Sequence, residues 1–151
     1  EAAAAGPVGD FLRELGARSH RDFAYLARSS QAELTGRDEA EDFATTIKAM
    51  GAFGIPDSEV VEILAAVHAV MQLGNVVFKA PANNSEGSEV EGRDDPNGAL
   101  ATAAKLLGVE PPDLEVALCQ RMMRVKDERA AQRTISQSRS VPQAKDGRDA
   151  L

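Results

Sequence analysis

Residues 59–78 read EVVEILAAVHAVMQLGNVVF and carry the clearest periodic pattern in the sequence. Apolar side chains recur there at helical spacing and form one stripe, made by Val60, Ile63, Leu64, Val67, Val70 and Met71. Gly74 follows the stripe and can take the left-handed conformation that ends a helix, and residues 76–78 favour a strand. The sequence therefore predicts a buried helix, a glycine stop and a short strand, covered by the flanking segments.

Composition limits the core that can cover this helix. The chain has 151 residues, which suits one domain, and only 4% of them are aromatic, with no Trp. Aliphatic side chains must therefore fill the core, which favours packed helices over a large sheet. His68 and Gln72 interrupt the longest apolar run, so we expect no membrane span. The single cysteine, Cys119, cannot form an internal disulfide, which is typical of a reducing compartment.

Charge is distributed unevenly along the chain. Residues 1–120 contain 9 basic and 20 acidic side chains, whereas residues 121–151 contain 8 basic and 4 acidic ones. A basic arm on an acidic body can steer toward an acidic protein, a nucleic acid or a membrane surface, although a solvated tail explains the same charges equally well. Because no aromatic residues are interleaved with the basic ones, we expect no nucleic-acid partner.

The N-terminal part of the chain predicts a weakly structured start. Residues 1–14 resemble a linker, with a helical turn near their end that closes at Gly16. Ser19 and Asp22 then have the spacing of a capping box, which predicts a short helix that carries Phe23.

Residues 36–54 predict a longer helix. Asp38 and Glu41 form a second capping pair at its start, and Gly54 is a plausible stop. Apolar side chains follow one face, at Phe43, Ile47, Met50 and Phe53. Only a few residues separate this helix from the central one, so we expect the two to pack as an antiparallel pair.

A polar loop and two helices follow the central helix. Residues 79–98 predict a surface loop with a weak return strand near residues 89–91. The first helix after the loop ends at Gly108, and the second starts after residues 111–113.

The basic arm begins with a hairpin pattern. Residues 122–125 and 133–135 favour two strands that turn at residues 126–128. Residues 136–141 have no regular pattern, and a further helix starts at residue 142, near the end of the sequence. In total the sequence predicts a mainly α, antiparallel helical subdomain with one or two short β-hairpins.

Motifs for catalysis are missing from the sequence. It contains no Walker-type phosphate loop, no GxGxxG, no CxxC pair and no HExxH. The residues His20, His68 and Cys119 are the only ones of their types, and nothing indicates that they converge. Cys119 fits a small core residue better than a nucleophile, because nothing near it in sequence lowers its pKa. We therefore expect no catalytic, cofactor-binding or metal-binding residue in this chain.

Several segments nevertheless occur in a familiar order. They are DFAYL at 22–26, GRDEAEDF at 36–43 with Thr46 and residues 49–50, QLGNV at 72–76 with Phe78, AAKLLGV at 103–109, and residues 143–144 with RDAL at 148–151. In order and spacing, residues 15–151 resemble the motor domain of myosins, in the later part of its upper actin-binding subdomain. Gln72 stands where the family usually has a histidine, and the segment between Arg121 and Gln143 is longer than is typical.

The resemblance implies an actin-based motor driven by ATP hydrolysis, of which this chain is a piece. The fold implied is the larger myosin motor fold, which is P-loop NTPase-like, and the parent would bind ATP and Mg²⁺. The family's phosphate loop and both nucleotide switches would lie outside this stretch, so the chain alone should not hydrolyse ATP. The implied location is the cytoplasm and its cytoskeleton.

The same resemblance places two candidate contact segments. Residues 121–133 match the cardiomyopathy loop, an actin-contacting hairpin, whose candidate residues here are Arg121, Arg124, Lys126, Asp127, Glu128, Arg129 and Arg133. Residues 79–98 match the loop named four, also near the filament, with Lys79, Glu86, Glu89, Glu91, Arg93, Asp94 and Asp95. The implied partners are the actin filament and the remainder of the motor domain.

Two alternatives remain from other classes of protein. A myosin-derived structural module without motor activity could serve as a scaffold in a larger assembly, since the missing nucleotide elements fit it as well. An unrelated all-helical adaptor would leave the ordered matches unexplained.

Overall fold

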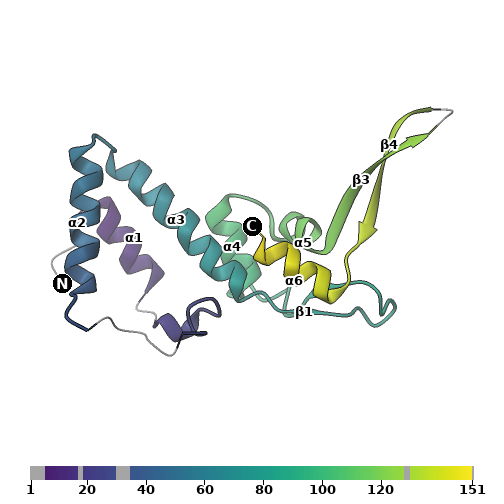
Figure 1. The fold of residues 1–151 in the computed structure, drawn as a ribbon, viewed down its shortest axis with the longest axis horizontal. Coiled ribbons are helices and arrows are strands. Elements are labelled where there is room, and N and C mark those ends of the chain that lie inside the picture. Colours follow the sequence, from purple (N-terminus) through teal and green to yellow (C-terminus); the bar gives the residue numbers. More distant parts are fainter. Residues whose placement is uncertain (1–5, 17–18, 30–34, 128–129, 151) are drawn as a thin grey trace. The chain divides into compact units, whose positions relative to one another are not determined.

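The computed structural model describes residues 6–16, 19–29, 35–127 and 130–150, with the side chains of residues 124–133 left out of the description. It divides into two compact units, residues 1–68 and residues 69–151, and helix α3 (Asp57–Gly74) crosses the boundary between them. The described residues form six α-helices, one 3-10 helix and two antiparallel strand pairs (Figure 1). The prediction of a mainly helical chain with β-hairpins is confirmed.

The first unit begins with a helix that is longer than the turn predicted before Gly16. Helix α1 (Pro7–Leu15) has its proline at the start, where the fixed φ of proline suits a helix and its missing N–H leaves no bond unmade. Val8, in the first turn, is buried. The predicted helical turn is therefore part of a helix that begins at Pro7, and this segment contributes to the core of its unit.

The capping box at Ser19 is present but starts a shorter element than predicted. The Asp22 carboxylate accepts a hydrogen bond from the Ser19 N–H at 2.7 Å, and Ser19 Oγ accepts one from the Arg21 N–H at 3.3 Å. The element is a single 3-10 turn, η1 (His20–Asp22), because Phe23 has an extended backbone and is buried. The ring of Phe23 meets His68 edge to face at 5.5 Å, so that histidine is a packed residue, as expected.

Helix α2 (Glu39–Ala52) starts and ends as predicted but packs differently. Asp38 accepts hydrogen bonds from the N–H groups of Ala40 and Glu41 at 3.0 and 3.1 Å, and Gly54 has a φ of +82° at the turn that follows. No residue of α2 is buried, and α2 and α3 diverge from their connecting turn (Figure 1). The predicted antiparallel packing is therefore wrong, and Phe53 is 88% exposed.

Helix α3 differs from the buried helix that its apolar stripe predicts. Val60 is buried, but Val67 and Val70, in the middle of the stripe, are 56% and 50% exposed. In the second unit the buried side chains of this helix are instead Gln72 and Leu73, with Ala69. Hydrophobic periodicity finds the helix but does not say which side the rest of the chain covers.

The end of α3 also follows another route than predicted. Gly74 is the last helical residue and is absent from the described glycines with positive φ, so no left-handed glycine ends this helix. The helix instead ends in a tighter turn, in which the N–H of Asn75 donates to the Gln72 carbonyl and the N–H of Val76 donates to the Leu73 carbonyl. The strand that follows is β1 (Phe78–Lys79), later than the predicted residues 76–78.

The second unit is assembled around helix α5 (Pro111–Cys119). This helix contacts helices α4 (Ala99–Leu107) and α6 (Val141–Asp149) and strands β2 (Glu89–Val90) and β3 (Gln120–Asp127). The core consists of Leu73, Val76, Phe78, Val90, Leu100, Ala103, Ala104, Leu114, Leu118, Cys119 and Ala144. Gly108 ends α4 in the left-handed conformation, as predicted, whereas α5 begins at Pro111 itself.

The C-terminal elements are longer than the sequence predicts. Strand β4 (Ala130–Ser138) pairs antiparallel with β3, so residues 136–138 belong to a strand and not to an irregular segment. Lys126 and Asp127 lie in β3 rather than in the turn, and Glu128 lies outside the described residues. Helix α6 extends to Asp149, with Ser140 and Gln143 forming a capping box at its start.

Candidate functional site

The hairpin formed by β3 and β4 is attached to the core at both of its inner ends. Strand β3 continues directly from α5, and the N–H of Arg139, just after β4, donates to the Cys119 carbonyl at 2.8 Å. The guanidinium of Arg139 donates to the Leu118 carbonyl at 3.2 Å. These carbonyls lie in the last turn of α5, where helical partners are lacking, so the hairpin and the helix satisfy each other. From this base the strands extend away from the helices of their unit (Figure 1).

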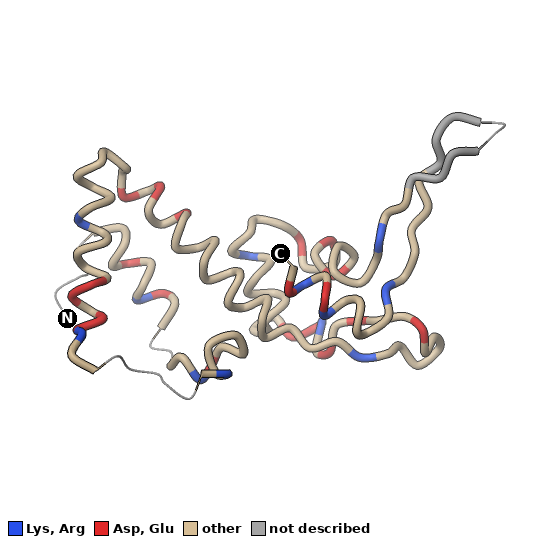
Figure 2. The backbone as a smooth tube through the Cα atoms, viewed as in Figure 1, with Lys and Arg blue, Asp and Glu red and all other residues tan. Residues whose placement is uncertain are grey.

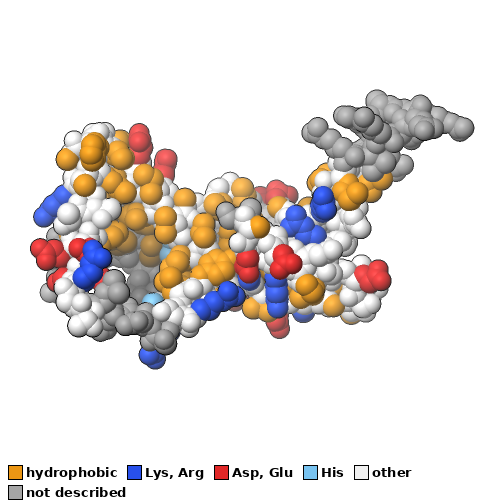
Figure 3. Space-filling model, viewed as in Figure 1, with side chains coloured by type: hydrophobic (Ala, Val, Ile, Leu, Met, Phe, Trp, Pro, Cys, Tyr) orange, Lys and Arg blue, Asp and Glu red, His pale blue; other side chains and the backbone are white. Residues whose placement is uncertain are grey.

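The described part of the hairpin presents both apolar and basic side chains. Met122 is 67% exposed, and Met123 and Ile135, which are partners across the two strands, are also exposed. Figure 3 shows hydrophobic side chains on this part of the hairpin, and Figure 2 shows basic positions at its foot. Exposed apolar side chains beside charged ones are typical of a surface that meets another protein.

The structure describes only some of the candidate actin-contacting residues predicted within residues 121–133. Arg121 is exposed at the start of β3. Four members have a described strand backbone but no described side chain: Arg124, Lys126, Asp127 and Arg133. Glu128 and Arg129 lie outside the described residues altogether. Their role stays a prediction.

Some of the candidate contact residues predicted in the polar loop, residues 79–98, lie close together. Lys79 and Glu89 are opposite each other in the β1–β2 pair, 3.5 Å apart, and Glu89 lies 3.6 Å from Arg93. Arg93 is also 3.7 Å from Glu115 of α5, whose carboxylate accepts a hydrogen bond from the Val90 N–H at 2.9 Å. Glu115 therefore fastens the loop to the core. The sequence reading missed it because the contact joins residues far apart in the chain.

The remaining acidic residues of that set do not join this cluster. Glu91 and Asp94 are exposed, and Asp95 accepts a hydrogen bond from the Asn97 N–H within its own turn. Glu86 lies elsewhere, in a hollow that it lines together with Gln137 and other residues at the foot of the hairpin. The loop and the hairpin base are therefore neighbours in this unit.

A buried arginine that the sequence reading did not single out joins three elements. Arg148 of α6 is 9% exposed and donates from Nη1 to the carbonyls of Val76, at 2.7 Å, and Gly74, at 3.4 Å. Its guanidinium lies 5.8 Å from the ring centre of Phe78 and 2.7 Å from the carboxylate of Asp149. A charge this buried needs such partners. Arg148 thus ties α6 to the end of α3 and to β1.

Cys119 is a core residue, as expected. It is buried, and this burial raises the pKa of its thiol, an effect that the Ser88 hydroxyl and the Arg139 guanidinium partly offset. The thiol therefore stays protonated at neutral pH and is a poor nucleophile. Within the described ranges, no three His, Cys, Asp or Glu residues are grouped so that they could hold a metal ion. None of the helices described has the length and apolar content needed to cross a bilayer.

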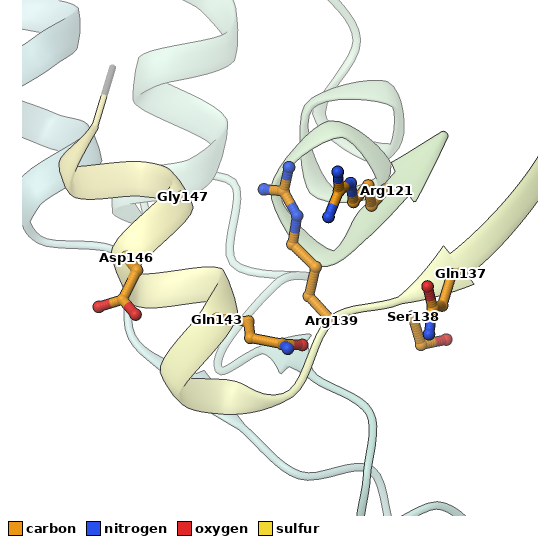
Figure 4. Close-up of a pocket in the computed structure, with 7 residues that line it drawn as sticks. All are labelled: Arg121, Gln137, Ser138, Arg139, Gln143, Asp146 and Gly147. Carbon is orange, nitrogen blue, oxygen red and sulfur yellow. The ribbon is translucent and has the colours of Figure 1, made fainter. Parts of the chain in front are cut away.

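A pocket of about 300 Å³ opens between the foot of the hairpin and α6 (Figure 4). Its lining residues are Arg121, Gln137, Ser138, Arg139, Gln143, Asp146 and Gly147. Almost every one of them carries a polar side chain, so the pocket suits a polar or charged group rather than an apolar one.

Comparison with known proteins identifies the family. The sequence model of the myosin head (motor domain) matches residues 5–151. The chain is 36% identical to unconventional myosin-Ib of Homo sapiens over 151 residues, which covers 97% of the chain and 12% of that protein. It is 34% identical to myosin-1 of Arabidopsis thaliana, covering 93% of the chain and 11% of the relative. For unconventional myosin-Ia of Gallus gallus the identity is 33%, with 97% and 13% covered.

The chain thus spans only about an eighth of the length of these relatives, between 11% and 13%. The match extends over both structural units and includes the hairpin, the polar loop and α6. The chain belongs to the myosin head (motor domain) family.

Proposed function

We propose that this chain is the actin-contacting part of an ATP-driven cytoskeletal motor, and that the β3–β4 hairpin makes the contact. One observation carries the proposal: a hairpin anchored on α5 at both ends presents exposed Met122, Met123 and Ile135 beside Arg121. Residues 120–138 also contain five basic and two acidic side chains. Actin is acidic, so a basic, partly apolar hairpin on a firm base is suited to meet it.

The remaining parts of the proposal come from membership of the family. Residues 15–151 would form part of the upper actin-binding subdomain of a P-loop NTPase-like motor, whose other parts bind ATP and Mg²⁺. In such a motor this subdomain forms one wall of a cleft that closes on actin, coupled to the nucleotide site by rigid-body movement. The protein would act on the cytoskeleton in the cytoplasm.

The polar loop has a different role in this proposal. Residues 79–98 contain two basic and five acidic side chains, so their net charge does not attract an acidic filament. The ion pairs of Glu89 and Glu115 with Arg93 hold the loop against its own core. We infer that this loop orients the motor on the filament and weakens binding, while the hairpin supplies the electrostatic attraction to actin.

Charge reversal on the hairpin tests the proposal. In the motor domain that contains this chain, Arg124→Glu with Lys126→Glu should weaken actin binding by about tenfold, or ~1.4 kcal/mol. Its salt dependence should become shallower, because fewer attractive charges remain to be screened. Co-sedimentation with actin filaments at several salt concentrations measures both effects.

A matched control separates this contact from net charge. Lys48→Glu with Lys145→Glu makes the same change in charge at exposed positions of helices α2 and α6, outside the hairpin. It should leave co-sedimentation at low salt nearly unchanged. Equal binding by the hairpin variant and the unaltered motor at low salt would refute the proposed contact. The parent sequence on either side then distinguishes a motor from a scaffold, since only a motor needs a phosphate loop and both switches.

A further inference from the structure

We propose that the pocket at the foot of the hairpin binds a carboxylate side chain from an acidic segment of the partner protein. The pocket lies between the start of β3, the end of β4 and helix α6. We assign the filament as the source of that segment, and this assignment rests on the function proposed above. Carboxylate binding by the pocket stands independently of it.

Two arginines give the pocket its positive charge. The side chain of Arg121 makes no hydrogen bond or ion pair with any residue that the structure describes. Arg139 is fixed by its bond to the Leu118 carbonyl, and both side chains line the same pocket. Figure 4 shows the two guanidinium groups directed to the same side of the pocket. Like charges gathered in this way repel each other, and a bound anion relieves that repulsion.

The charge of the lining selects a carboxylate over a phosphate. Asp146 of α6 also lines the pocket, so two arginines and one aspartate leave a formal charge of about +1, although the Asp146 carboxylate points away from the two guanidinium groups (Figure 4). A monoanion neutralises this charge, whereas a phosphate dianion would exceed it. A guanidinium also matches a carboxylate with two parallel hydrogen bonds.

The surroundings of the pocket favour a peptide over a small free acid. A second hollow of about 580 Å³ shares Gln137, Ser138 and Gln143 with the pocket and continues to residues 84–86 of the polar loop. Amide and hydroxyl groups line most of this extension, together with the carboxylate of Glu86, and the amides and hydroxyls can bond to the N–H and C=O groups of an extended segment. One acidic side chain would occupy the pocket while its backbone follows the hollow.

A glycine opposite Arg139 makes room for this arrangement. A methyl group on Gly147 would overlap Nη1 of Arg139 and approach its Cζ to 3.2 Å. The backbone of Gly147 is helical, so alanine is allowed there and would raise helix propensity by about 1 kcal/mol. The Gly147→Ala variant should displace the guanidinium that lines the pocket. Its gain in helix propensity roughly offsets the lost bond from Arg139 to the Leu118 carbonyl, so its stability should change little.

The test uses a fluorescently labelled, capped peptide of four glutamates and the motor domain that contains this chain. Fluorescence anisotropy should show binding that a peptide of four glutamines lacks. Arg121→Gln should weaken binding by at least about tenfold, since it removes charge-assisted hydrogen bonds. Lys145→Gln, which removes a neighbouring exposed charge outside the pocket, should change binding less than about twofold.

Two further variants give outcomes that loss of structure would not produce. Asp146→Asn should tighten the binding of the glutamate peptide, because it removes the negative charge among the lining residues. Gly147→Ala should weaken binding while the melting temperature changes little. Equal binding of the two peptides, or equal effects of Arg121→Gln and Lys145→Gln on peptide binding, would overturn the proposal that this pocket binds a carboxylate. Tighter binding of inorganic phosphate than of the glutamate peptide would overturn its assignment to carboxylates.

Actin co-sedimentation of Arg121→Gln separates this inference from the proposed function. If the peptide binds and the variant sediments less with actin, both stand. If the charge-reversed hairpin loses actin but Arg121→Gln binds peptide and actin normally, the pocket is wrong and the proposed function stands. If the peptide binds as expected but neither variant affects actin, the proposed filament contact is wrong and the pocket stands as a site for another acidic protein.

Discussion

Arg148 shows how much a single buried side chain holds together in the unit formed by residues 69–151. It satisfies the carbonyls of Gly74 and Val76 and lies against the Phe78 ring. Arg148→Met keeps much of the volume but leaves these carbonyls without their donor, and each unpaired buried group costs about 1–3 kcal/mol. We expect the local stability of β1 and α6 to fall by about 2–4 kcal/mol, as measured by native-state hydrogen exchange.

Two companion variants identify the cause. Arg148→Lys keeps the charge but not the planar fork, so its loss should be intermediate. Lys145→Met makes a similar change at an exposed position of the same helix and should cost less than about 0.5 kcal/mol. If Lys145→Met is as damaging as Arg148→Met, the carbonyl contacts are not what stabilises this junction.

At the scale of residues, local chemistry could be predicted and long-range partners could not. The capping roles of Ser19 and Asp38 depend on neighbours two and three residues away, and both were predicted. The carbonyls that Arg148 binds are more than 70 residues away, and no short-range pattern marks them. Glu115 was missed for the same reason, since its bond is to the backbone of Val90.

Among the elements, α6 depends most visibly on its first turn. Ser140 accepts a hydrogen bond from the Gln143 N–H, and the Gln143 side chain accepts one from the Ser140 N–H at 3.0 Å. Ser140→Ala removes half of this box and should destabilise α6 by about 1 kcal/mol. Because α6 forms one wall of the pocket, glutamate-peptide binding should weaken together with α6 protection in hydrogen exchange.

The conservative variant checks this reading of the cap. Ser140→Thr keeps an oxygen at the same place and should restore both α6 protection and peptide binding. If Ser140→Ala lowers protection in α5 as much as in α6, then the effect is a general loss of packing rather than the loss of a cap.

The elements also show where periodicity stops being informative. Helices α2, α4 and α5 were all predicted from their apolar positions and end signals, and all are present. The stripe on α3 predicted burial, yet Val67 and Val70 are exposed while Ala69 and Gln72 are buried. A stripe records which face is apolar, but what covers that face is a tertiary property. The same limit explains why the hairpin was recognised while its length and its pocket were not.

For the whole molecule, the two units differ in how much they bury. In the first, the described buried core side chains are Val8, Phe23 and Val60, and α2 has none. The core of the second is larger and continuous around α5. Since apolar burial is the main stabilising term, we expect the first unit to open well before the second. In native-state hydrogen exchange, the amides of α2 should exchange faster than those of α5.

Matched core truncations test whether the two units open separately. Val60→Ala should speed exchange in the first unit and leave α5 unchanged, whereas Leu118→Ala should lower protection throughout the second unit, by about 2–5 kcal/mol. Exposed apolar side chains such as Phe53 also predict that opening of the first unit promotes self-association, so exchange there should depend on protein concentration. Equal protection of α2 and α5, or a single transition shifted alike by both truncations, would mean that the chain is one cooperative unit despite its two cores.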